Sequence, residues 1–226
     1  MKRILLAGAC AQILVAASGM FAAATAQSQG IETVTVTAQK RSESAQNVPI
    51  ALSVLTAEDL KRQGITKVNG LQYATPSLEA VPAFGSGQPE FRLRGVGFDD
   101  YASNNSSTVG VYVDEVAYPI PAQTQGSIFD VERTEVLYGP QGTLYGVNTT
   151  GGAINFITNK PQDDFGFGLT ADYDSHNEFI GNGYVTGQIT DGLDGRLAFI
   201  TDQGGSWQKN RDTGQNFGKK DTTSVR

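Results

Sequence analysis

The sequence is poor in the residue types on which most metal, redox and nucleophilic sites depend. Its 226 residues include one cysteine, one histidine and one tryptophan. A structural zinc site needs four Cys or His ligands and a disulfide framework needs paired cysteines, so the composition excludes both. The sequence also lacks a Gly-x-Ser-x-Gly elbow, a phosphate-binding loop and a dinucleotide-binding fingerprint. We therefore expect no enzymatic activity, no cofactor and no metal site. A calcium site with oxygen ligands is the alternative, although no segment has the loop spacing typical of one.

Positive charge and long apolar runs are also scarce. There are 17 Lys and Arg against 23 Asp and Glu, which gives a net charge of −6. The sequence pI is about 4.8 and the mean hydropathy is −0.25. Nucleic-acid binding is disfavoured because the phosphates need a basic face. Several membrane-spanning helices are excluded too, but a β-barrel is not, because its lipid-facing residues alternate with polar ones.

The first 26 residues have the features of an export signal. Lys2-Arg3 precede an apolar stretch that ends in the small residues Ala24-Thr25-Ala26. This pattern predicts a signal peptide over residues 1–26 that is removed before Gln27, and the alternative of an uncleaved anchor fits the small terminal residues less well. Cys10, the only cysteine, lies within the signal. The mature chain therefore has no thiol.

Residues 27–46 are polar and lack a core-forming pattern, which predicts a flexible N-terminal arm. Within this arm, residues 31–37 alternate Val with Thr and favour an extended strand. Such a segment suits addition to the edge of a partner's sheet. On the residues alone, it could equally be the first strand of the following domain.

Residues 47–161 have the pattern of a compact α+β domain. Thr56 is the expected N-cap of a helix, with Asp59 as its partner and Gly64 at its end. A second short helix and four strands are expected over residues 68–73, 91–94, 109–114, 133–137 and 153–158.

Residues 162–226 change to long alternating strands. Apolar and polar or small residues alternate strictly over residues 165–174, the length of a tilted membrane strand. A second strand is expected over residues 179–190, a tight turn over 191–195 and a third strand from Arg196 to about Thr201. A soluble antiparallel meander is the alternative, since alternation alone does not distinguish the two.

An ordered series of motifs resembles the N-terminal plug of TonB-dependent outer-membrane receptors. The resemblance runs from residue 31 to about residue 160. Single fragments are weak, but their order is specific. The series includes Val34-Thr35-Val36-Thr37-Ala38, Leu93-Arg94-Gly95-Val96-Gly97, Val111-Tyr112-Val113-Asp114-Glu115-Val116, Asp130-Val131-Glu132-Arg133-Thr134-Glu135-Val136-Leu137, Gly139-Pro140-Gln141-Gly142-Thr143-Leu144-Tyr145-Gly146 and Thr150-Gly151-Gly152-Ala153-Ile154-Asn155.

The resemblance implies a plug domain followed by the start of an antiparallel transmembrane β-barrel, which has 22 strands when complete. It implies import of ferric siderophores, cobalamin or another scarce solute across the outer membrane of a Gram-negative bacterium. The implied partners are TonB, outer-membrane lipid and a small-molecule ligand, with no nucleic acid. The 65 residues after Pro161 suffice for three strands and the start of a fourth, so we expect an N-terminal fragment that does not transport alone. The alternative is a free periplasmic plug-like module that binds TonB or a ligand without a barrel.

The resemblance also implies three groups of site residues. The TonB-binding box would comprise Ile31, Glu32, Thr33, Val34, Thr35 and Val36. The ligand-facing plug loops would contribute Phe84, Gln88, Phe98 and Tyr101. The plug motif and a lock between plug and barrel would comprise Arg94, Gly95, Asp114, Glu132, Arg133, Glu135, Gly139, Pro140, Gln141, Gly142, Gly151 and Gly152.

The charged members of the lock have a second interpretation. Arg94, Arg133, Glu132 and Glu135 could pair with the barrel wall, or they could pair within the plug or lie in solvent. Tyr138 and Val147 stand where the family commonly has Arg. These two departures leave the strength of the lock open.

Overall fold

The computed structural model describes residues 34–82, 89–97, 106–146, 148–175, 177–206 and 208–226. Several predicted features lie outside these residues. They are the signal peptide, the first three residues of the predicted TonB-binding box, the four predicted ligand-facing residues and Val147.

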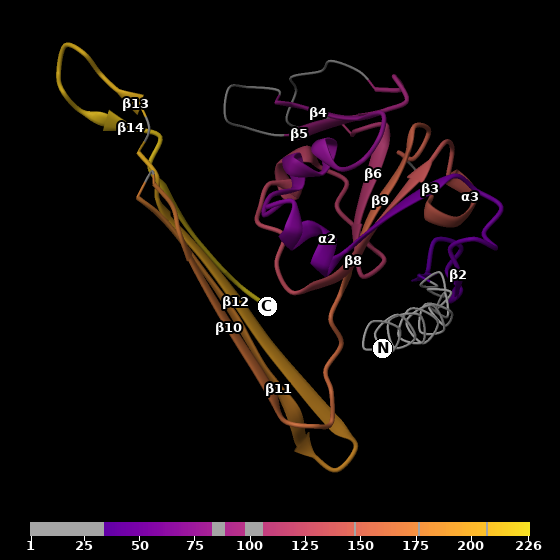
Figure 1. Cartoon of the computed structure of the whole chain (residues 1–226). Coiled ribbons are helices and arrows are strands. Elements are labelled where there is room, and N and C mark those ends of the chain that lie inside the picture. The colour runs from indigo at the N-terminus through magenta and orange to yellow at the C-terminus, as the bar shows by residue number, and fades with distance from the viewer. Residues whose placement is uncertain (1–33, 83–88, 98–105, 147, 176, 207) are drawn as a thin grey trace, which may run out of the picture. The chain divides into compact units, whose positions relative to one another are not determined.

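A five-stranded sheet forms the centre of the N-terminal domain (Figure 1). Its order is β3-β8-β9-β6-β7, and all neighbours are antiparallel except the parallel pair β6 and β9. The central strands β8 and β9 are buried along nearly their whole length, whereas β3 lies at an edge. The strands are β3 (Leu52–Thr56), β6 (Val109–Val113), β7 (Val116–Ala117), β8 (Val131–Tyr138) and β9 (Gly152–Thr158).

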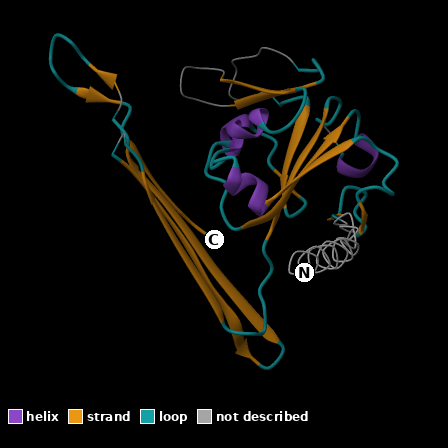
Figure 2. Cartoon of the chain, viewed as in Figure 1, coloured by secondary structure: helices purple, strands orange, loops and turns teal. Residues whose placement is uncertain are grey.

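Short helices surround this sheet (Figure 2). The predicted first helix is confirmed as α2 (Ala57–Arg62), with Thr56 and Asp59 forming a capping box and Gly64 at a φ of +65° just beyond the helix. The predicted second helix occupies the expected residues but is a 3-10 helix, η1 (Val68–Tyr73). Two further elements are η2 (Pro121–Thr124) and α3 (Gly142–Tyr145).

The two faces of the sheet carry separate apolar clusters, because successive residues of a strand point to opposite faces. Val136 and Ile154 face the cluster that contains Leu60 of α2 and Leu71 of η1. Their chain neighbours Leu137 and Ala153 face the second cluster, which contains Tyr112, Tyr145, Val36, Ala38 and Val48. The second cluster therefore joins the sheet to the N-terminal segment of the chain.

Two small antiparallel pairs complete the domain. The first joins β1 (Thr35–Val36) to β2 (Glu43–Ser44), and the second joins β4 (Leu78–Pro82) to β5 (Pro89–Leu93). Strands β3, β4 and β7 are additions to the four strands predicted for this domain. β3 and β4 have only five residues each and follow or precede a helix closely, and β7 has two residues, so none has room to show its alternation.

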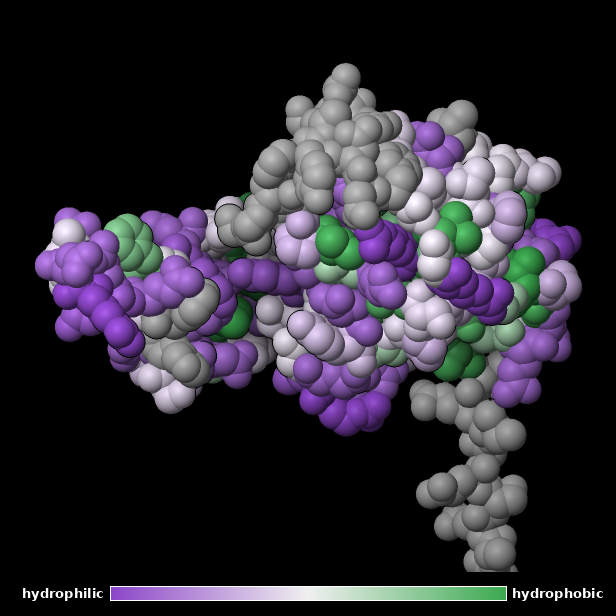
Figure 3. Space-filling model, turned by 90° about the horizontal axis from the view of Figure 1, so that it is seen from above, coloured by the Kyte–Doolittle hydropathy of each residue, from purple (hydrophilic) through white to green (hydrophobic). Residues whose placement is uncertain are grey.

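The C-terminal residues form a four-stranded antiparallel sheet in the order β10-β11-β12-β15 (Figure 1). The strands are β10 (Gly166–Tyr173), β11 (Glu178–Thr190), β12 (Leu193–Gly204) and β15 (Lys220–Val225). The turn predicted over residues 191–195 is shorter, because Leu193 and Asp194 already pair with β11 and only Asp191-Gly192 connect the strands. A separate hairpin joins β13 (Gln208–Lys209) to β14 (Asn216–Phe217), where hydrophilic residues predominate (Figure 3).

The predicted alternation of β10 is confirmed by exposure. Phe165, Phe167, Leu169 and Tyr173 are 69 to 76% exposed on one side of the strand. Thr170 and Asp172 have opposite parity and line a cavity instead. A water-soluble meander buries its apolar face. The exposed apolar face therefore favours the membrane-strand interpretation.

No helix within the described ranges is long and apolar enough to cross a membrane.

Candidate functional site

The N-terminal segment from residue 34 is packed onto the domain. Thr35 and Val36 pair with Ser44 and Glu43, and the Ala45 N–H donates to the Val34 carbonyl over 2.9 Å. Val36 and Ala38 are fully buried in the second apolar cluster. The described part of the segment predicted as a flexible arm is thus folded. The physical reason is burial, because a buried Val side chain contributes about 1.5 to 3 kcal/mol.

Polar contacts hold the residues that follow the predicted TonB-binding box. The Thr37 N–H donates to Glu135 Oε1 over 2.8 Å, and Arg133 Nη2 donates to Thr37 Oγ1 over 3.3 Å. The Tyr145 hydroxyl donates to the Ala38 carbonyl over 3.2 Å. Side chains about a hundred residues away in the sequence therefore hold the backbone directly after the box.

Glu135 and Arg133 form a buried ion pair beneath this segment. Both lie on β8 two residues apart and so share one face. Arg133 Nε donates to Glu135 Oε1 over 2.8 Å, and the two side chains are 10% and 0% exposed. Arg133 Nη1 also contacts the carboxylate of Glu132, whose side chain is 48% exposed. Of the two predicted alternatives for Arg133, the described contacts fit pairing within the domain.

One oxygen of the buried carboxylate has no recorded partner. Among the described residues, Glu135 Oε2 accepts no hydrogen bond. The other oxygen, Oε1, accepts hydrogen bonds from both Arg133 and Thr37. A buried charge is costly unless it is paired, and these two contacts stabilise it. Movement of Thr37 would therefore remove one of the groups that stabilise the Glu135 charge.

Tyr145 and Tyr112 form the aromatic part of this site, which the sequence reasoning missed. Their rings meet edge to face with centroids 4.9 Å apart, and the Tyr112 hydroxyl donates to the Tyr145 carbonyl over 2.6 Å. Burial, and then the negative charge of Glu135, raise the pKa of Tyr145. Burial also raises the pKa of Tyr112. Both phenols therefore stay protonated as donors. The available signal in the sequence was that each tyrosine lies within a quoted motif, Tyr112 in residues 111–116 and Tyr145 in residues 139–146.

Arg94 and Tyr138 contact each other away from the buried ion pair. The Arg94 guanidinium lies 4.6 Å from the centroid of the Tyr138 ring, a cation–π distance. The Tyr138 hydroxyl is 2.9 Å from Ser53 Oγ and donates to the Pro76 carbonyl over 3.0 Å. Tyr138 thus joins β8, β3 and the loop after η1. The aromatic ring at this position supports Arg94 where a second cation would repel it.

The remaining motif residues shape turns. Asp114 accepts hydrogen bonds from the N–H and hydroxyl of Thr158 over 2.9 and 2.8 Å. The Gly139 N–H donates to the Gly151 carbonyl over 3.1 Å, which closes the loop that contains Pro140, Gln141 and Gly142. A Cβ at Gly152 would lie 2.2 Å from the Leu137 carbonyl oxygen, and its φ of +149° is one that side chains rarely adopt. Gly95, at a φ of +77°, turns the chain after Arg94.

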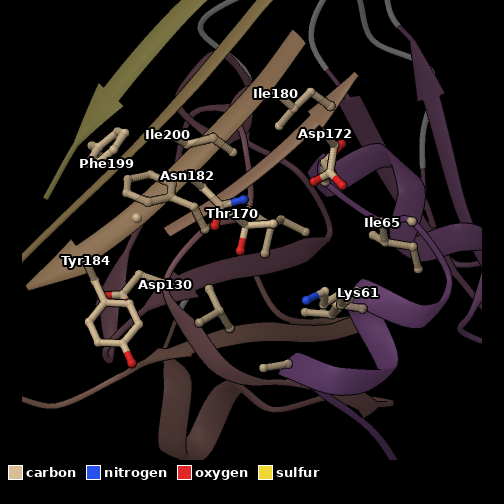
Figure 4. Close-up of a pocket in the computed structure, with 18 of the residues that line it drawn as sticks. Lys61, Ile65, Asp130, Thr170, Asp172, Ile180, Asn182, Tyr184, Phe199 and Ile200 are labelled. Carbon is tan, nitrogen blue, oxygen red and sulfur yellow. The ribbon is translucent and has the colours of Figure 1, made fainter. Parts of the chain in front are cut away.

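A cavity of about 760 Å³ lies between α2, the start of β8 and the face of β10–β12 that carries Thr170 and Asp172 (Figure 4). Lys61 lines it from α2, and Ile180 and Ile200 line it from β11 and β12. No group of three or more His, Cys, Asp or Glu side chains in the described part of the chain is arranged to hold a metal ion. The cavity lining is mixed rather than built for one charged ligand.

The sequence matches the family described as the TonB-dependent Receptor Plug Domain over residues 44–153. Residues 44–153 are a TonB-dependent receptor plug domain. The plug therefore accounts for the five-stranded sheet and the helices around it, and the fold class predicted from the sequence is confirmed.

Curated relatives agree with this assignment. The chain is 33% identical over 168 residues to the pesticin receptor of Yersinia pestis, covering 73% of this chain and 24% of that protein. It is 29% identical over 185 residues to the iron-regulated outer membrane virulence protein of Vibrio cholerae, covering 72% of this chain and 26% of that protein. The chain thus spans about a quarter of the length of the curated relatives it matches.

Solved structures share the plug and early barrel strands. The ferric yersiniabactin uptake receptor FyuA of Yersinia pestis aligns with a TM-score of 0.67 and 28% identity, covering 75% of this chain and 27% of that one. The FpvAI receptor in its complex with pyocin S2 aligns with a TM-score of 0.64 and 20% identity, covering 75% of this chain and 22% of that one. At this lower identity the second likeness shows the fold alone.

Proposed function

We propose that this chain is the N-terminal part of a TonB-dependent active transporter that imports a ferric-siderophore complex or another scarce solute across the outer membrane. The support is a plug domain followed by strands with an exposed apolar face. One of the similar solved structures is that of a ferric yersiniabactin uptake receptor, which favours the iron-chelate class. Activity, solute and partners of the whole protein belong to this proposal.

The proposal that TonB supplies the energy for transport rests on one observation, the strand formed by Thr35 and Val36. This segment already makes antiparallel ladder hydrogen bonds with Glu43 and Ser44. A TonB strand could replace that partner without changing the backbone conformation, because an extended segment pairs through its main chain. We propose Ile31–Val36 as the box that TonB binds after release from the plug.

The mechanism proposed for this box has three steps. The solute binds on the outer face, partly to plug loops that include Phe84, Gln88, Phe98 and Tyr101. The segment then leaves its site on the plug and pairs with TonB. Pulling on it moves or partly unfolds the plug and opens a path. Diffusion through an open pore cannot concentrate a solute, so the energy has to arrive by this contact.

Replacing Val34 with Pro tests the box. Proline removes a backbone donor and fixes φ, so Val34→Pro should lower affinity for the purified TonB C-terminal domain at least about tenfold. Ser28→Pro, outside the box in the same segment, is the control and should bind as the original chain does. Isothermal titration calorimetry supplies the measurement. Equal binding by both variants would remove the box assignment.

Location separates this proposal from a free periplasmic module. We propose export through cleavage before Gln27, followed by insertion of β10–β12 and β15 into the outer membrane. Mass spectrometry of the exported protein measures the cleavage site. Fractionation measures the location, and recovery of the chain wholly in the soluble periplasm would favour the module.

A further inference from the structure

A buried ion pair joins the plug to the first barrel strands. Arg196 of β12 donates through Nε to Asp130 Oδ2 over 2.8 Å and to Oδ1 over 3.1 Å, and its Nη2 also contacts Oδ1. The two side chains are 9% and 7% exposed. A guanidinium that meets both oxygens of a carboxylate is among the strongest pairings in proteins and is specific in direction.

Asp130 also ties together two plug strands. It lies directly before β8, and its carbonyl accepts the N–H of Asn159, the residue after β9, over 3.0 Å. Its carboxylate accepts Asn159 Nδ2 over 3.0 Å. Asp130 has a φ of +52°, a conformation that Asp and Asn tolerate better than other side chains. One residue therefore links the start of β8, the end of β9 and the barrel strand β12.

Arg196, the partner of Asp130 on the barrel strands, is also held by a neighbouring side chain. The Arg196 guanidinium lies 4.0 Å from the centroid of the Tyr184 ring on β11. The cavity of about 760 Å³ and a second cavity of about 420 Å³ both adjoin this group, and Asn159, Tyr184 and Arg196 line both. The ion pair thus spans a place where plug and strands are otherwise separated by space.

A second ion pair between the plug and the strands is weaker, because one of its partners is half exposed to water. Lys67 Nζ lies 3.3 Å from Asp202 Oδ2, with Lys67 47% exposed and Asp202 4% exposed. An exposed lysine makes a single flexible contact, whereas both side chains of the Asp130–Arg196 pair are largely buried. Removing one partner of a shielded pair leaves an uncompensated buried charge.

We propose that Asp130 and Arg196 form the main side-chain attachment of the plug to strands β10–β12, and that Tyr184 and Asn159 position them. This attachment holds the β8–β9 end of the plug in place. Pulling on the N-terminal segment acts first at Leu52 of the edge strand β3, which pairs with Leu137 at the other end of β8. The direction of pulling rests on the proposed function, but the attachment does not.

Hydrogen–deuterium exchange of the 226-residue chain refolded in detergent micelles tests the attachment without TonB. Asp130→Asn, Arg196→Gln and their double variant are compared with Arg62→Gln, whose side chain is 67% exposed. Asn keeps the tolerance for positive φ, so Asp130→Asn removes mainly the charge. Each single variant should speed exchange at residues 159–162 and 195–197 at least about tenfold.

The double variant distinguishes a coupled pair from two separate defects. Its exchange should be no faster than that of the stronger single variant, because the second change removes nothing further. Strands β4 and β5 and the Arg62→Gln control should keep their original rates. Additive effects, unchanged rates, or faster exchange spread equally over β4 and β5 would each overturn the attachment.

Arg196→Lys covers the case in which Arg196→Gln does not refold. It keeps the charge and loses the paired geometry, so it should give the same regional pattern with a smaller increase. Unchanged exchange in this variant would also overturn the proposal. The binding of TonB to the Val34→Pro variant is measured in a separate experiment. Failure of the TonB-binding box can therefore be distinguished from failure of the Asp130–Arg196 attachment.

Discussion

Glu135 shows how one side chain links the N-terminal segment to the plug interior. Its oxygen Oε1 accepts both Arg133 Nε and the Thr37 N–H, while the side chain is fully buried. The segment after the proposed box therefore helps to stabilise a charge inside the sheet. Displacing the segment weakens the ion pair, so the two events are energetically coupled.

Replacing Glu135 with Gln should destabilise the chain by about 3 kcal/mol, because the half-exposed Glu132 is then the one carboxylate left beside the buried Arg133 among the described residues. Urea unfolding followed by circular dichroism measures the change. Glu132→Gln is the matched control and should cost less than about 1 kcal/mol. Equal losses in the two variants would contradict a special role for Glu135.

Tyr145 predicts a dependence of stability on alkaline pH. Its pKa is raised in the folded plug, whereas an unfolded tyrosine ionises near pH 10, as a rough reference value. Below that pH both states are protonated and stability is unaffected; above it the unfolded state is favoured, so stability falls as pH rises.

Tyr145→Phe should make this alkaline loss of stability shallower while costing about 1 kcal/mol near neutral pH, because the hydrogen bond to Ala38 is lost. Unfolding midpoints between about pH 8 and 11 bracket the reference pKa and supply the measurement. Tyr73→Phe, at a side chain that is 82% exposed, is the control. An unchanged slope in Tyr145→Phe would remove the argument.

At the scale of elements, the sequence predicts those that depend on neighbouring residues and misses those that depend on distant contacts. Helix α2 has its own cap in Thr56 and Asp59, and β10 has its own alternation, so both could be predicted from neighbouring residues. The docking of β1 could not, because it depends on Glu135 and Tyr145, which the chain brings back only after a hundred residues.

The same distinction applies to the attachment of the plug to the barrel strands. The motif drew attention to Arg133 and Glu135, but these face the docked segment. The residue that reaches the barrel strands is Asp130, at the start of the same motif, and its partner Arg196 lies in a strand with no comparable signature. Sequence order cannot show which charged residue meets a strand 66 positions later.

The α2 cap gives a prediction at this scale. Thr56 hydrogen bonds hold the pKa of Asp59 below its ordinary value, with a smaller contribution from Arg62. Thr56→Ala should cost about 1 kcal/mol near neutral pH, whereas Thr56→Ser should retain most of the stability. The cost should shrink as the pH falls from about 4 through the lowered pKa, because the benefit depends on the ionised Asp59. A cost independent of pH, measured by urea unfolding at several pH values, would contradict the capping box.

At the scale of the whole molecule, the two faces of the C-terminal strands have opposite environments. Phe167 and Leu169 project from β10 to the exposed apolar side, and Thr170 projects to the cavity side. The same strand therefore separates a surface suited to lipid from one that faces the plug. Adjacent residues offer a direct comparison of the two.

Leu169→Arg should reduce the fraction of the chain that stays in carbonate-washed outer membranes, at a cost of about 2 to 4 kcal/mol near the middle of the bilayer. Thr170→Arg changes the neighbouring residue on the opposite face and should leave membrane retention nearly unchanged. Immunoblotting of the washed fraction measures retention. Equal loss in both variants would show that the two faces do not differ in contact with lipid.

The hairpin of β1 and β2 offers two routes for a pull on the box. One route is covalent, along the turn that includes Arg41, whose side chain is 70% exposed. The other is non-covalent and consists of the pairing of β1 with β2 and the contacts that Val36, Thr37 and Ala38 make with the sheet. A cut after Arg41 would leave the second route alone. The segment would then behave as a bound peptide, and its withdrawal would release TonB from the receptor without deforming the plug.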